Sequence, residues 1–364
     1  MRSGRVKIVL LLASIIGGMA IAVIAYTAYW FVAAAEIEDR IADWAADQRA
    51  RGITVEADAP VVRGYPLHFE VSLQHPSIDN LGAGWAWRGE TVTASFRPWR
   101  FDKFNLKING KNNLRFFDGA AWQDFESQIE DGRAWLELDD TREIEMLMLD
   151  FKHIDLAGPW GEGSAFIARM RARAERRTSA EAQPNPASGS DVDSNAAPFE
   201  FATAALDVED IRLPPGYGEE MGEQVEYLNF DFSMFGVFPD GNTDTALHMW
   251  RDDGGMLELN SFRLRWGPLG IESNGIIALD AEMRPIGALT ADITGYGDII
   301  DALIISNMIP LGDAFLAKVA FNMMAFKPDD GGPPVLRSVP VMAQDGGIFV
   351  GPVAVGTLPA IRFQ

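Results

Sequence analysis

The sequence predicts a mainly β protein, a β-rich α+β fold with one large twisted antiparallel sheet, a late covering helix pair and one N-terminal transmembrane helix. Three observations lead to this fold class: a long uncharged run near the N-terminus, repeated segments in which apolar and polar residues alternate, and a late pair of apolar helical segments. The 364 residues include 35 glycines and 20 prolines, which favours frequent turns over a helical bundle.

The first element is a membrane anchor. Residues 8–35 contain no charged side chain, whereas Arg2, Arg5 and Lys7 precede the run and Glu36 follows it. As a helix the run reaches roughly 40 Å, enough to cross a hydrocarbon core of about 30 Å. Because basic flanks stay cytoplasmic, the sequence predicts a single-pass membrane protein with a cytoplasmic N-terminus and the bulk of the chain on the far side of the membrane.

The alternative to a retained signal-anchor is a cleaved secretory signal, for which residues 33–35 supply three alanines. An apolar signal region is about 7–15 residues long, shorter than this run. The helix is also predicted to continue as an amphipathic stalk, with Ile37, Ile41 and Trp44 on one stripe, and to end at Gly52. Residues 1–52 therefore form a cytoplasmic tip, an anchor and a stalk helix.

After residue 52 the dominant period is two. Leu67, Phe69, Val71 and Leu73 alternate with polar residues and share one strand face. Similar segments recur at 91–96, 104–108, 133–138, 145–151, 166–174, 202–208, 225–235, 256–266, 270–279 and 348–355. Turn dipeptides such as Asn-Gly at 109–110, Asp-Gly at 118–119 and Asp-Gly at 131–132 separate several of them. Consecutive strands with short turns predict a meander.

Two antiparallel β regions, 53–177 and 199–364, are predicted on either side of a polar segment. Residues 178–198 lose all hydrophobic period and are rich in Ala, Ser, Pro, Asn and Asp, which predicts a disordered linker or loop. Just before it, Arg169, Arg171 and Arg173 share one strand face. They could bind phosphate groups, but a solvated edge face is favoured in so acidic a chain.

The last predicted elements are two helices at about 298–326, broken at Pro310, with Asp313 placed to cap the second one. The second helix is apolar nearly all round, yet too short to cross a bilayer. It is expected either to lie as core across the concave face of the sheet or to be a mobile or membrane-touching element. Its side chains make a candidate hydrophobic groove or lid: Phe315, Leu316, Val319, Met323 and Met324.

Composition and motifs exclude several kinds of chemistry. The chain has 52 acidic and 31 basic residues and a net charge of -21, which disfavours nucleic-acid partners. It has no cysteine, and its four histidines show no metal-ligand spacing. The serine-hydrolase elbow, the Walker loop and the dinucleotide-binding glycine turn are missing from the sequence. No catalytic, metal-binding or cofactor-binding residue is therefore predicted, and the protein is not expected to be an enzyme.

One set of short motifs carries a resemblance to a known family. The motifs are Gly64-Tyr65-Pro66, Leu213-Pro214-Pro215-Gly216, Trp250-Arg251-Asp252-Asp253-Gly254-Gly255, Leu264-Arg265-Trp266-Gly267-Pro268-Leu269, Asp280 with Arg284-Pro285, and Asp345-Gly346-Gly347. Over about residues 54–360 the chain resembles the proteobacterial domain-of-unknown-function family 2125, which implies a membrane-anchored periplasmic protein and no known catalytic residue. More loosely, its layout is similar to that of AsmA-like periplasmic proteins, which implies a role in lipid traffic or outer-envelope assembly.

These observations predict a non-enzymatic periplasmic protein that binds or passes lipid or another hydrophobic molecule in envelope biogenesis. A structural or scaffolding envelope protein without a ligand is the first alternative, and a cell-envelope hydrolase acting through carboxylates is the second. An unfilled apolar trough would favour the carrier, a packed interior would favour the scaffold, and two inward carboxylates in a polar cleft would favour the hydrolase.

Overall fold

The computed structural model describes residues 2–161, 163–177, 199–218, 221–239, 243–305, 311–328 and 332–361. The predicted linker 178–198 lies outside these ranges. The described chain folds into one N-terminal helix, one large antiparallel sheet and three shorter α-helices. This arrangement confirms the predicted fold class.

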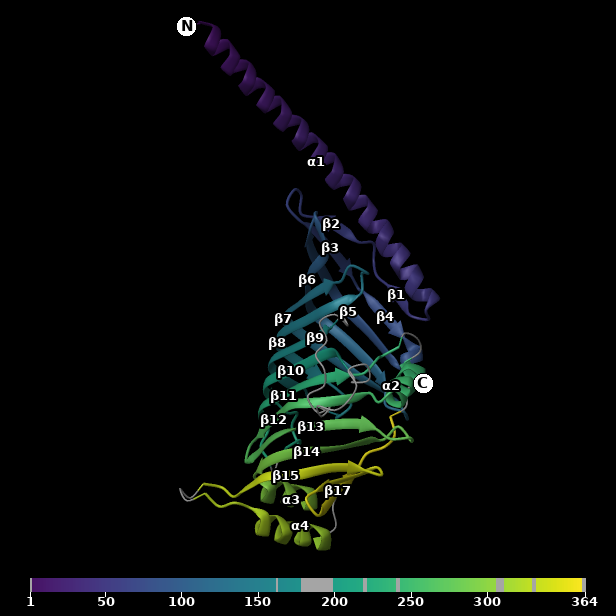
Figure 1. The fold of residues 1–364 in the computed structure, drawn as a ribbon, viewed down its shortest axis with the longest axis vertical. Helices are drawn as coiled ribbons and strands as arrows, with labels where there is room; N and C mark the ends of the chain where they lie inside the picture. Colours follow the sequence, from purple (N-terminus) through teal and green to yellow (C-terminus); the bar gives the residue numbers. More distant parts are fainter. Residues whose placement is uncertain are drawn as a thin grey trace, which may run out of the picture.

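Helix α1 (Arg2–Ala50) is a single continuous helix of 49 residues. Its N-terminal part projects away from the sheet, while its C-terminal part lies along one end of it (Figure 1). In the described side chains, the segment Met19–Ala50 is long and apolar enough to cross a membrane. The predicted anchor and stalk are thus parts of one continuous helix.

The sheet contains 17 described strands. They are β1 (Thr54–Glu56), β2 (Val61–Arg63), β3 (Phe69–Gln74), β4 (Ser77–Asn80), β5 (Trp85–Arg97), β6 (Arg100–Phe117), β7 (Trp122–Leu138), β8 (Ile144–Ala157), β9 (Ala165–Arg176), β10 (Glu200–Arg212), β11 (Gln224–Phe235), β12 (Met256–Trp266), β13 (Leu269–Leu279), β14 (Pro285–Thr294), β15 (Val335–Gln344), β16 (Gly347–Val350) and β17 (Val353–Thr357).

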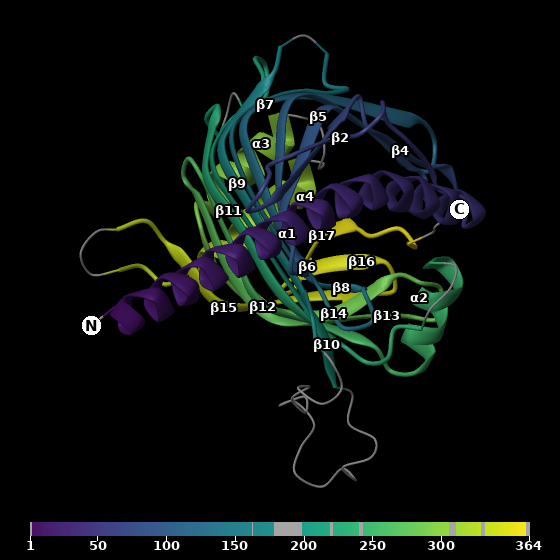
Figure 2. The same cartoon turned by 90° about the horizontal axis from the view of Figure 1, so that it is seen from above.

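From β5 to β17 every strand pairs antiparallel with the next, as a meander requires. At the start, β3 and β4 pair with different halves of β5, β2 pairs with β3, and β1 pairs with β4. The sheet does not close on itself. Its strands are stacked along the long axis of the molecule and curve into a tall gutter, which α1 crosses at one end (Figures 1 and 2).

Two predicted turns are wrong, and their residues instead bend the sheet. Strand β6 runs straight through Asn109-Gly110, and β7 runs through Asp131-Gly132. The register between the two strands shifts at this point, and Asn109 Oδ1 accepts a hydrogen bond of 2.9 Å from the Gly132 amide. A Cβ at position 132 would lie 2.1 Å from the Ile108 carbonyl oxygen. Residues 130–132 of β7 here lie opposite residues 108–109 of β6, and a bulge of this kind bends the strand.

Other boundaries also differ from the predictions. Leu67 precedes β3 and lies in an exposed turn, whereas Phe69 and Val71 are buried as predicted. Segment 348–355 is two strands, because Gly351 turns the chain with a φ of +55°. The predicted edge strand with the three arginines is wrong, since β9 pairs with both β8 and β10.

The late helices are confirmed, with shifted ends. Helix α3 (Tyr296–Ile305) and helix α4 (Leu311–Met324) lie at the far end of the gutter from α1 (Figure 1). Because α4 begins at Leu311, Asp313 belongs to its first turn and does not precede it. A third helix, α2 (Thr243–Asp252), was not predicted and lies between β11 and β12 in the chain.

Candidate functional site: the apolar trough

The concave face of the sheet carries a line of directly paired residues that runs from β3 to β15. The line consists of Val71, Ala94, Leu106, Ala134, Leu149, Ala172, Leu206, Phe230, Phe262, Ser273, Ala291 and Val339. Directly paired residues present their side chains on the same face. Ser273 is its one polar member. Successive strands therefore continue one apolar surface over the length of the gutter.

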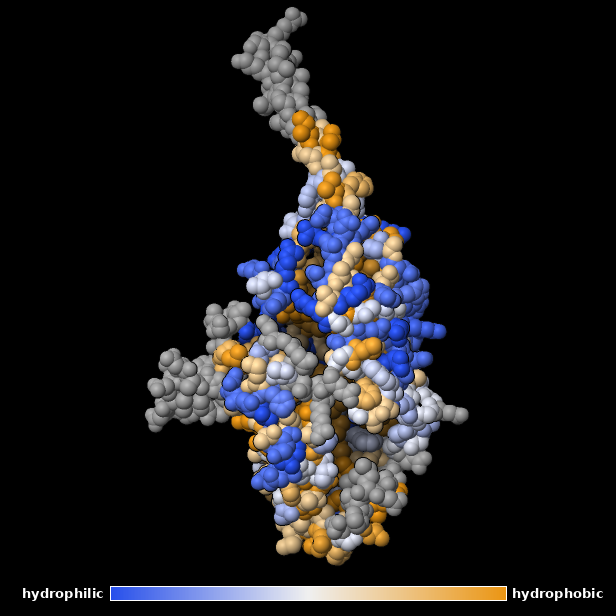
Figure 3. Space-filling view, turned by 90° about the vertical axis from the view of Figure 1, so that its right-hand side faces the viewer, coloured by the Kyte–Doolittle hydropathy of each residue, from blue (hydrophilic) through white to orange (hydrophobic). Residues whose placement is uncertain are grey.

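Two parallel lines widen this surface. One consists of Phe104, Leu136, Leu147, Ala174, Ala204, Phe232, Leu259, Gly275, Leu289, Val341 and Val350. The other consists of Phe151, Met170, Val208, Leu228, Leu264, Ile271, Ile293 and Leu336. We call the three lines together the apolar trough. Figure 3 shows a hollow with a hydrophobic interior running between more polar margins.

The trough is covered at its two ends. At the near end, Val71 belongs to a buried cluster with Trp30 and Ile37 of α1. At the far end, Ala291 and Val339 belong to a second buried cluster with α3 and α4. These are the two buried clusters found in the described residues.

Between the two clusters the trough has no second layer among the described residues. Leu206, Phe230 and Phe262 are only half-buried, whereas Val339 at the far end is 2% exposed. Large apolar side chains in the middle of a sheet usually reach full burial only under a facing sheet or helix. Around these three side chains the trough is therefore an apolar surface that the described part of the chain covers only partly, whereas Val208 on the neighbouring line is 5% exposed.

A cavity of about 540 Å³ lies at the near end, between α1 and the sheet. Its wall is mainly apolar and includes Ile37, Ile41, Phe96 and Phe104, while Arg142 is one of its charged members. Phe104 also belongs to the trough. The cavity is thus continuous with the trough and has the size of a small ligand pocket.

The far end is closed by small and aromatic side chains of α4. Ala314, Ala317 and Phe321 are buried against α3 and the sheet. The Tyr296 hydroxyl of α3 donates a hydrogen bond of 3.0 Å to Asn322 Oδ1, and Tyr296 packs edge-on against Phe321. Burial raises the pKa of the Tyr296 hydroxyl above its ordinary value. The two helices therefore form a fixed plug.

The residues predicted as a groove or lid all lie on α4. All five are exposed: Phe315 (67%), Leu316 (66%), Val319 (42%), Met323 (83%) and Met324 (42%). A Cβ at position 351 would lie 3.0 Å from Met324 Cε and 3.6 Å from Val339 Cγ2, so Met324 lies beside the trough residue Val339. Their role as a groove or lid stays a prediction. The trough residues themselves could be found from the period-two alternation of the strands, which places them all on one face.

The convex face of the same strands carries charge. Arg169 Nε and Nη2 donate to the two carboxylate oxygens of Asp150 at 2.8 and 2.9 Å, and Arg171 forms an ion pair of 2.5 Å with Glu209. The hydrogen bonds from the Arg169 guanidinium hold the pKa of Asp150 below its usual value. The predicted arginine face is thus real, and cross-strand acidic partners hold it.

A separate polar cavity of about 640 Å³ contains His75, Glu90, Glu126 and Asp155. Glu90 Oε2 accepts a hydrogen bond of 2.9 Å from the Lys111 amide, and His75 Nδ1 lies 2.9 Å from Asp58 Oδ2. In the ranges that the structure describes, no group of three or more His, Asp or Glu residues could hold a metal ion.

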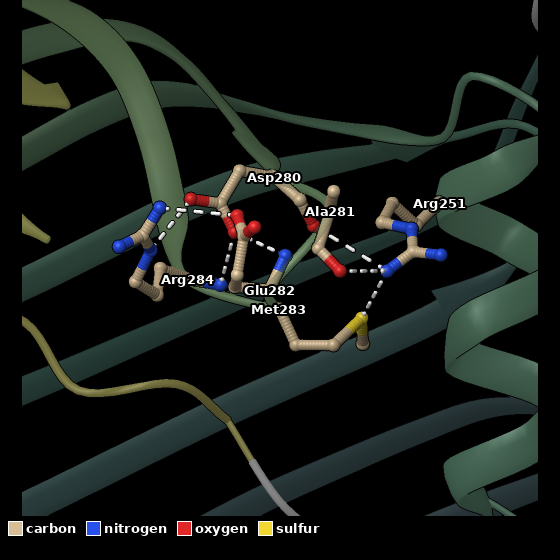
Figure 4. Close-up of polar contacts among 6 residues, drawn as sticks. All are labelled: Arg251, Asp280, Ala281, Glu282, Met283 and Arg284. Atoms are coloured by element: carbon tan, nitrogen blue, oxygen red, sulfur yellow. Dashed lines mark hydrogen bonds and ion pairs between the residues drawn. The ribbon is translucent and has the colours of Figure 1, made fainter. Parts of the chain in front are cut away.

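Two of the sequence motifs meet at the turn between β13 and β14. Figure 4 shows Arg251, from the end of α2, reaching this turn. Its Nη1 donates to the Ala281 carbonyl at 3.1 Å and contacts Met283 Sδ at 3.0 Å. Asp280 accepts hydrogen bonds from the Arg284 amide at 2.8 Å and from Arg284 Nε at 2.7 Å. The motifs Trp250–Gly255 and Asp280–Arg284 therefore join the end of α2 to the β13–β14 turn, outside the trough.

The fold and the trough define a class: a chain with one apolar N-terminal helix and an open, curved antiparallel sheet whose concave face is apolar. The chain belongs to the family described as "Uncharacterized protein conserved in bacteria" (DUF2125), whose model matches residues 30–359. This match confirms the family resemblance. Neither a curated protein nor a solved structure matched the chain, so the looser likeness to AsmA-like proteins stays a prediction.

Proposed function

We propose that this protein is held in the bacterial inner membrane by α1 and that its apolar trough binds, and passes along its length, a lipid or another elongated hydrophobic molecule. The N-terminus lies in the cytoplasm and the sheet in the periplasm. The protein carries out no catalysis in this proposal. Its role belongs to the transport or assembly of envelope components.

The observation that carries this proposal is the half-buried middle of the trough. Apolar surface left in water costs about 25 cal/mol per Å², and monomeric soluble proteins seldom expose large continuous apolar patches. Leu206, Phe230 and Phe262 lie in one continuous line on neighbouring strands. Acyl chains laid along this line would remove it from water. The gutter shape suits an elongated molecule better than a compact one (Figure 3).

The basic flank supports the orientation. Arg2, Arg5 and Lys7 precede the apolar run, and Glu36, Glu38 and Asp39 follow it. Positive charges next to a spanning helix favour the cytoplasmic side. The family match begins at residue 30, so the sheet and the stalk together form the family's shared part.

The alternatives receive less support from the geometry. A scaffold without a ligand would be expected to cover its own apolar face, as α3 and α4 do at the far end. A hydrolase would need a positioned acid and base, whereas Glu90 in the polar cavity is bonded to the Lys111 backbone.

Photo-crosslinking tests the proposal directly. p-Benzoylphenylalanine is placed at Leu206, which faces the trough, or at Asp207, the next residue, which faces outward. The full-length protein is irradiated in native membranes, purified and analysed by mass spectrometry. We expect lipid adducts from position 206 and few from position 207. Equal yields at both positions, or a purified wild-type protein that carries no lipid, would contradict the proposal.

A further inference from the structure

Four exposed apolar side chains gather at the end of the sheet next to α1. Tyr65 and Leu67 come from the turn between β2 and β3, and Trp99 and Phe101 come from the turn between β5 and β6 and the start of β6. They are 44%, 68%, 60% and 40% exposed, in that order. We call these four residues the tip. Tyr65 also stacks on Phe31 of α1 and Phe101 packs against Phe96, whereas Leu67 and Trp99 are the most exposed of the four.

Hydrogen bonds join the two turns of the tip to residues 26–29 of α1. The Tyr26 hydroxyl donates to the Pro66 carbonyl, and the Thr27 and Tyr65 hydroxyls lie 2.7 Å apart. The Tyr29 hydroxyl donates to the Pro98 carbonyl at 2.9 Å. Both turns of the tip therefore lie beside residues 26–29 of α1, within the uncharged run of residues 8–35.

The length of α1 fixes the depth of this level. Residues 8–25 rise by roughly 27 Å at about 1.5 Å per residue, slightly less than a hydrocarbon core of about 30 Å. A tilted helix needs still more residues to cross the same thickness. If Lys7 stays at the cytoplasmic surface, residues 26–29 must lie at the opposite boundary of the bilayer. The tip cannot then stand clear of the membrane, because it is bonded to those residues.

The chemistry of the tip suits that boundary. Tyrosine and tryptophan are enriched where apolar chains meet headgroups. Trp99 is flanked by Arg97 and Arg100, both exposed, and long basic side chains beside an inserted aromatic ring can reach the headgroup phosphates. These two basic residues are opposite in sign to the headgroup phosphates, and Arg100 Nη2 also lies 3.4 Å from Asp102 Oδ2.

We propose that the tip, Tyr65, Leu67, Trp99 and Phe101, is inserted into the periplasmic headgroup region of the inner membrane beside α1, so that the near end of the sheet sits in the bilayer surface. This inference rests on the proposed spanning of the membrane by α1. It does not require the trough to hold a ligand. Phe101 also lines the near-end cavity, which places the mouth of that cavity at the membrane.

Site-directed spin labelling of the full-length protein in phospholipid nanodiscs tests the proposal. The chain has no cysteine, so single variants carry one label each. Leu67→Cys and Trp99→Cys probe the tip, and Ile21→Cys probes the exposed surface of α1. Ala281→Cys, exposed in the distant turn between β13 and β14, is the matched aqueous control. Collision rates with oxygen and with a water-soluble nickel chelate give the depth of each label.

We expect the oxygen-to-nickel ratio to be highest at position 21, several-fold above the control at positions 67 and 99, and lowest at position 281. A lipid-like ratio at position 21 together with water-like ratios at 67 and 99 would overturn the tip insertion and leave the anchor standing. Water-like ratios at position 21 as well would overturn the anchor and the inference together.

Discussion

Adjacent residues of one strand lie on opposite faces of this sheet. Leu206 and Asp207 are neighbours, yet one continues the apolar trough and the other belongs to the charged convex face. This alternation is legible in the sequence because the period of a strand is two. The packing around glycines could not be predicted from the sequence, because the residues that contact a glycine can lie far from it in the chain.

Gly255 gives the first prediction, because a side chain there would meet Trp250. A Cβ at position 255 would lie 2.3 Å from the Trp250 ring, which is 3% exposed and donates through Nε1 to the Phe235 carbonyl at 2.9 Å. We expect Gly255→Ala to lower the free energy of unfolding by about 1–3 kcal/mol through overpacking. Gly297→Ala is the control, since a Cβ there has open space. Thermal melts that show equal effects for both variants would contradict this packing argument.

The Asp150 carboxylate gives a prediction about pH. Its pKa is lowered chiefly by the hydrogen bonds from Arg169, so the folded state favours the ionised form. The stabilisation is therefore present above the unfolded pKa of about 3.9 and is lost as the pH falls toward the lower folded value. The pair is partly exposed, 36% for Arg169 and 18% for Asp150, so about 1 kcal/mol or less is expected.

Asp150→Asn tests this contribution. We expect the variant to melt below the wild-type protein at pH 7, and the gap between the two melting temperatures to close as the pH falls below about 4. Melts over a pH series on both proteins measure the gap. A gap that stays constant through the acid range would show that the loss comes from packing and not from the charge of Asp150.

At the scale of elements, the predictions succeeded where a pattern was long and failed where the meaning of a residue depended on a neighbouring strand. The period-two segments became strands, and the run of residues 8–35 became part of one helix. Asn109-Gly110 was predicted as a turn because that dipeptide favours hairpins, but it sits opposite Gly132 as a bulge. Helix α2 was missed although Ala246 and Trp250, both buried, have helical spacing.

Helix α4 shows why its exposed face could not be assigned. Its sequence is apolar nearly all round, so periodicity did not distinguish the packed side from the free one. The structure packs the side with Ala314, Ala317 and Phe321, which allows close approach to α3. Phe315, Leu316, Val319, Met323 and Met324 remain exposed. Small residues at helical spacing were the signal in the sequence for the packed side.

Two aspartate substitutions separate the two faces of α4. Ala317 is 6% exposed and Val319 is 42% exposed. We expect Ala317→Asp to lower the free energy of unfolding by several kcal/mol, because it buries an unpaired carboxylate. Val319→Asp should change it by about 0.5 kcal/mol or less. Chemical denaturation of both variants provides the measurement, and a larger loss for Val319→Asp would reverse the assignment of faces.

At the scale of the whole molecule, the sheet joins what the sequence presented as two regions. Strands β9 and β10 flank the segment 178–198 and pair directly, so one continuous surface passes from the α1 end to the α3–α4 end. This continuity could not be predicted from either region alone, because strand pairing across a long insertion leaves no local pattern. The proposed passage of a ligand along the trough depends on this continuity.

The last prediction uses that continuity. Photo-crosslinkers at Val92, in the near-end cavity, and at Leu289, toward the far end of the trough, report lipid at the two ends. The double variant Phe230→Asp, Phe262→Asp places two carboxylates across the middle of the trough, where acyl chains would have to desolvate them. If lipid enters at the membrane and moves along the trough, adducts at position 92 should persist while those at position 289 fall several-fold.

The control for this variant is Asn229→Asp, Arg263→Asp, which changes the adjacent convex-face residues of the same two strands. Both double variants must retain a cooperative melt for the comparison to count. Equal losses at positions 92 and 289 in the trough variant would indicate one static binding site, because passage predicts that a block in the middle affects only the end beyond it. Unchanged adducts at both positions would show that the lipid does not pass through the middle of the trough.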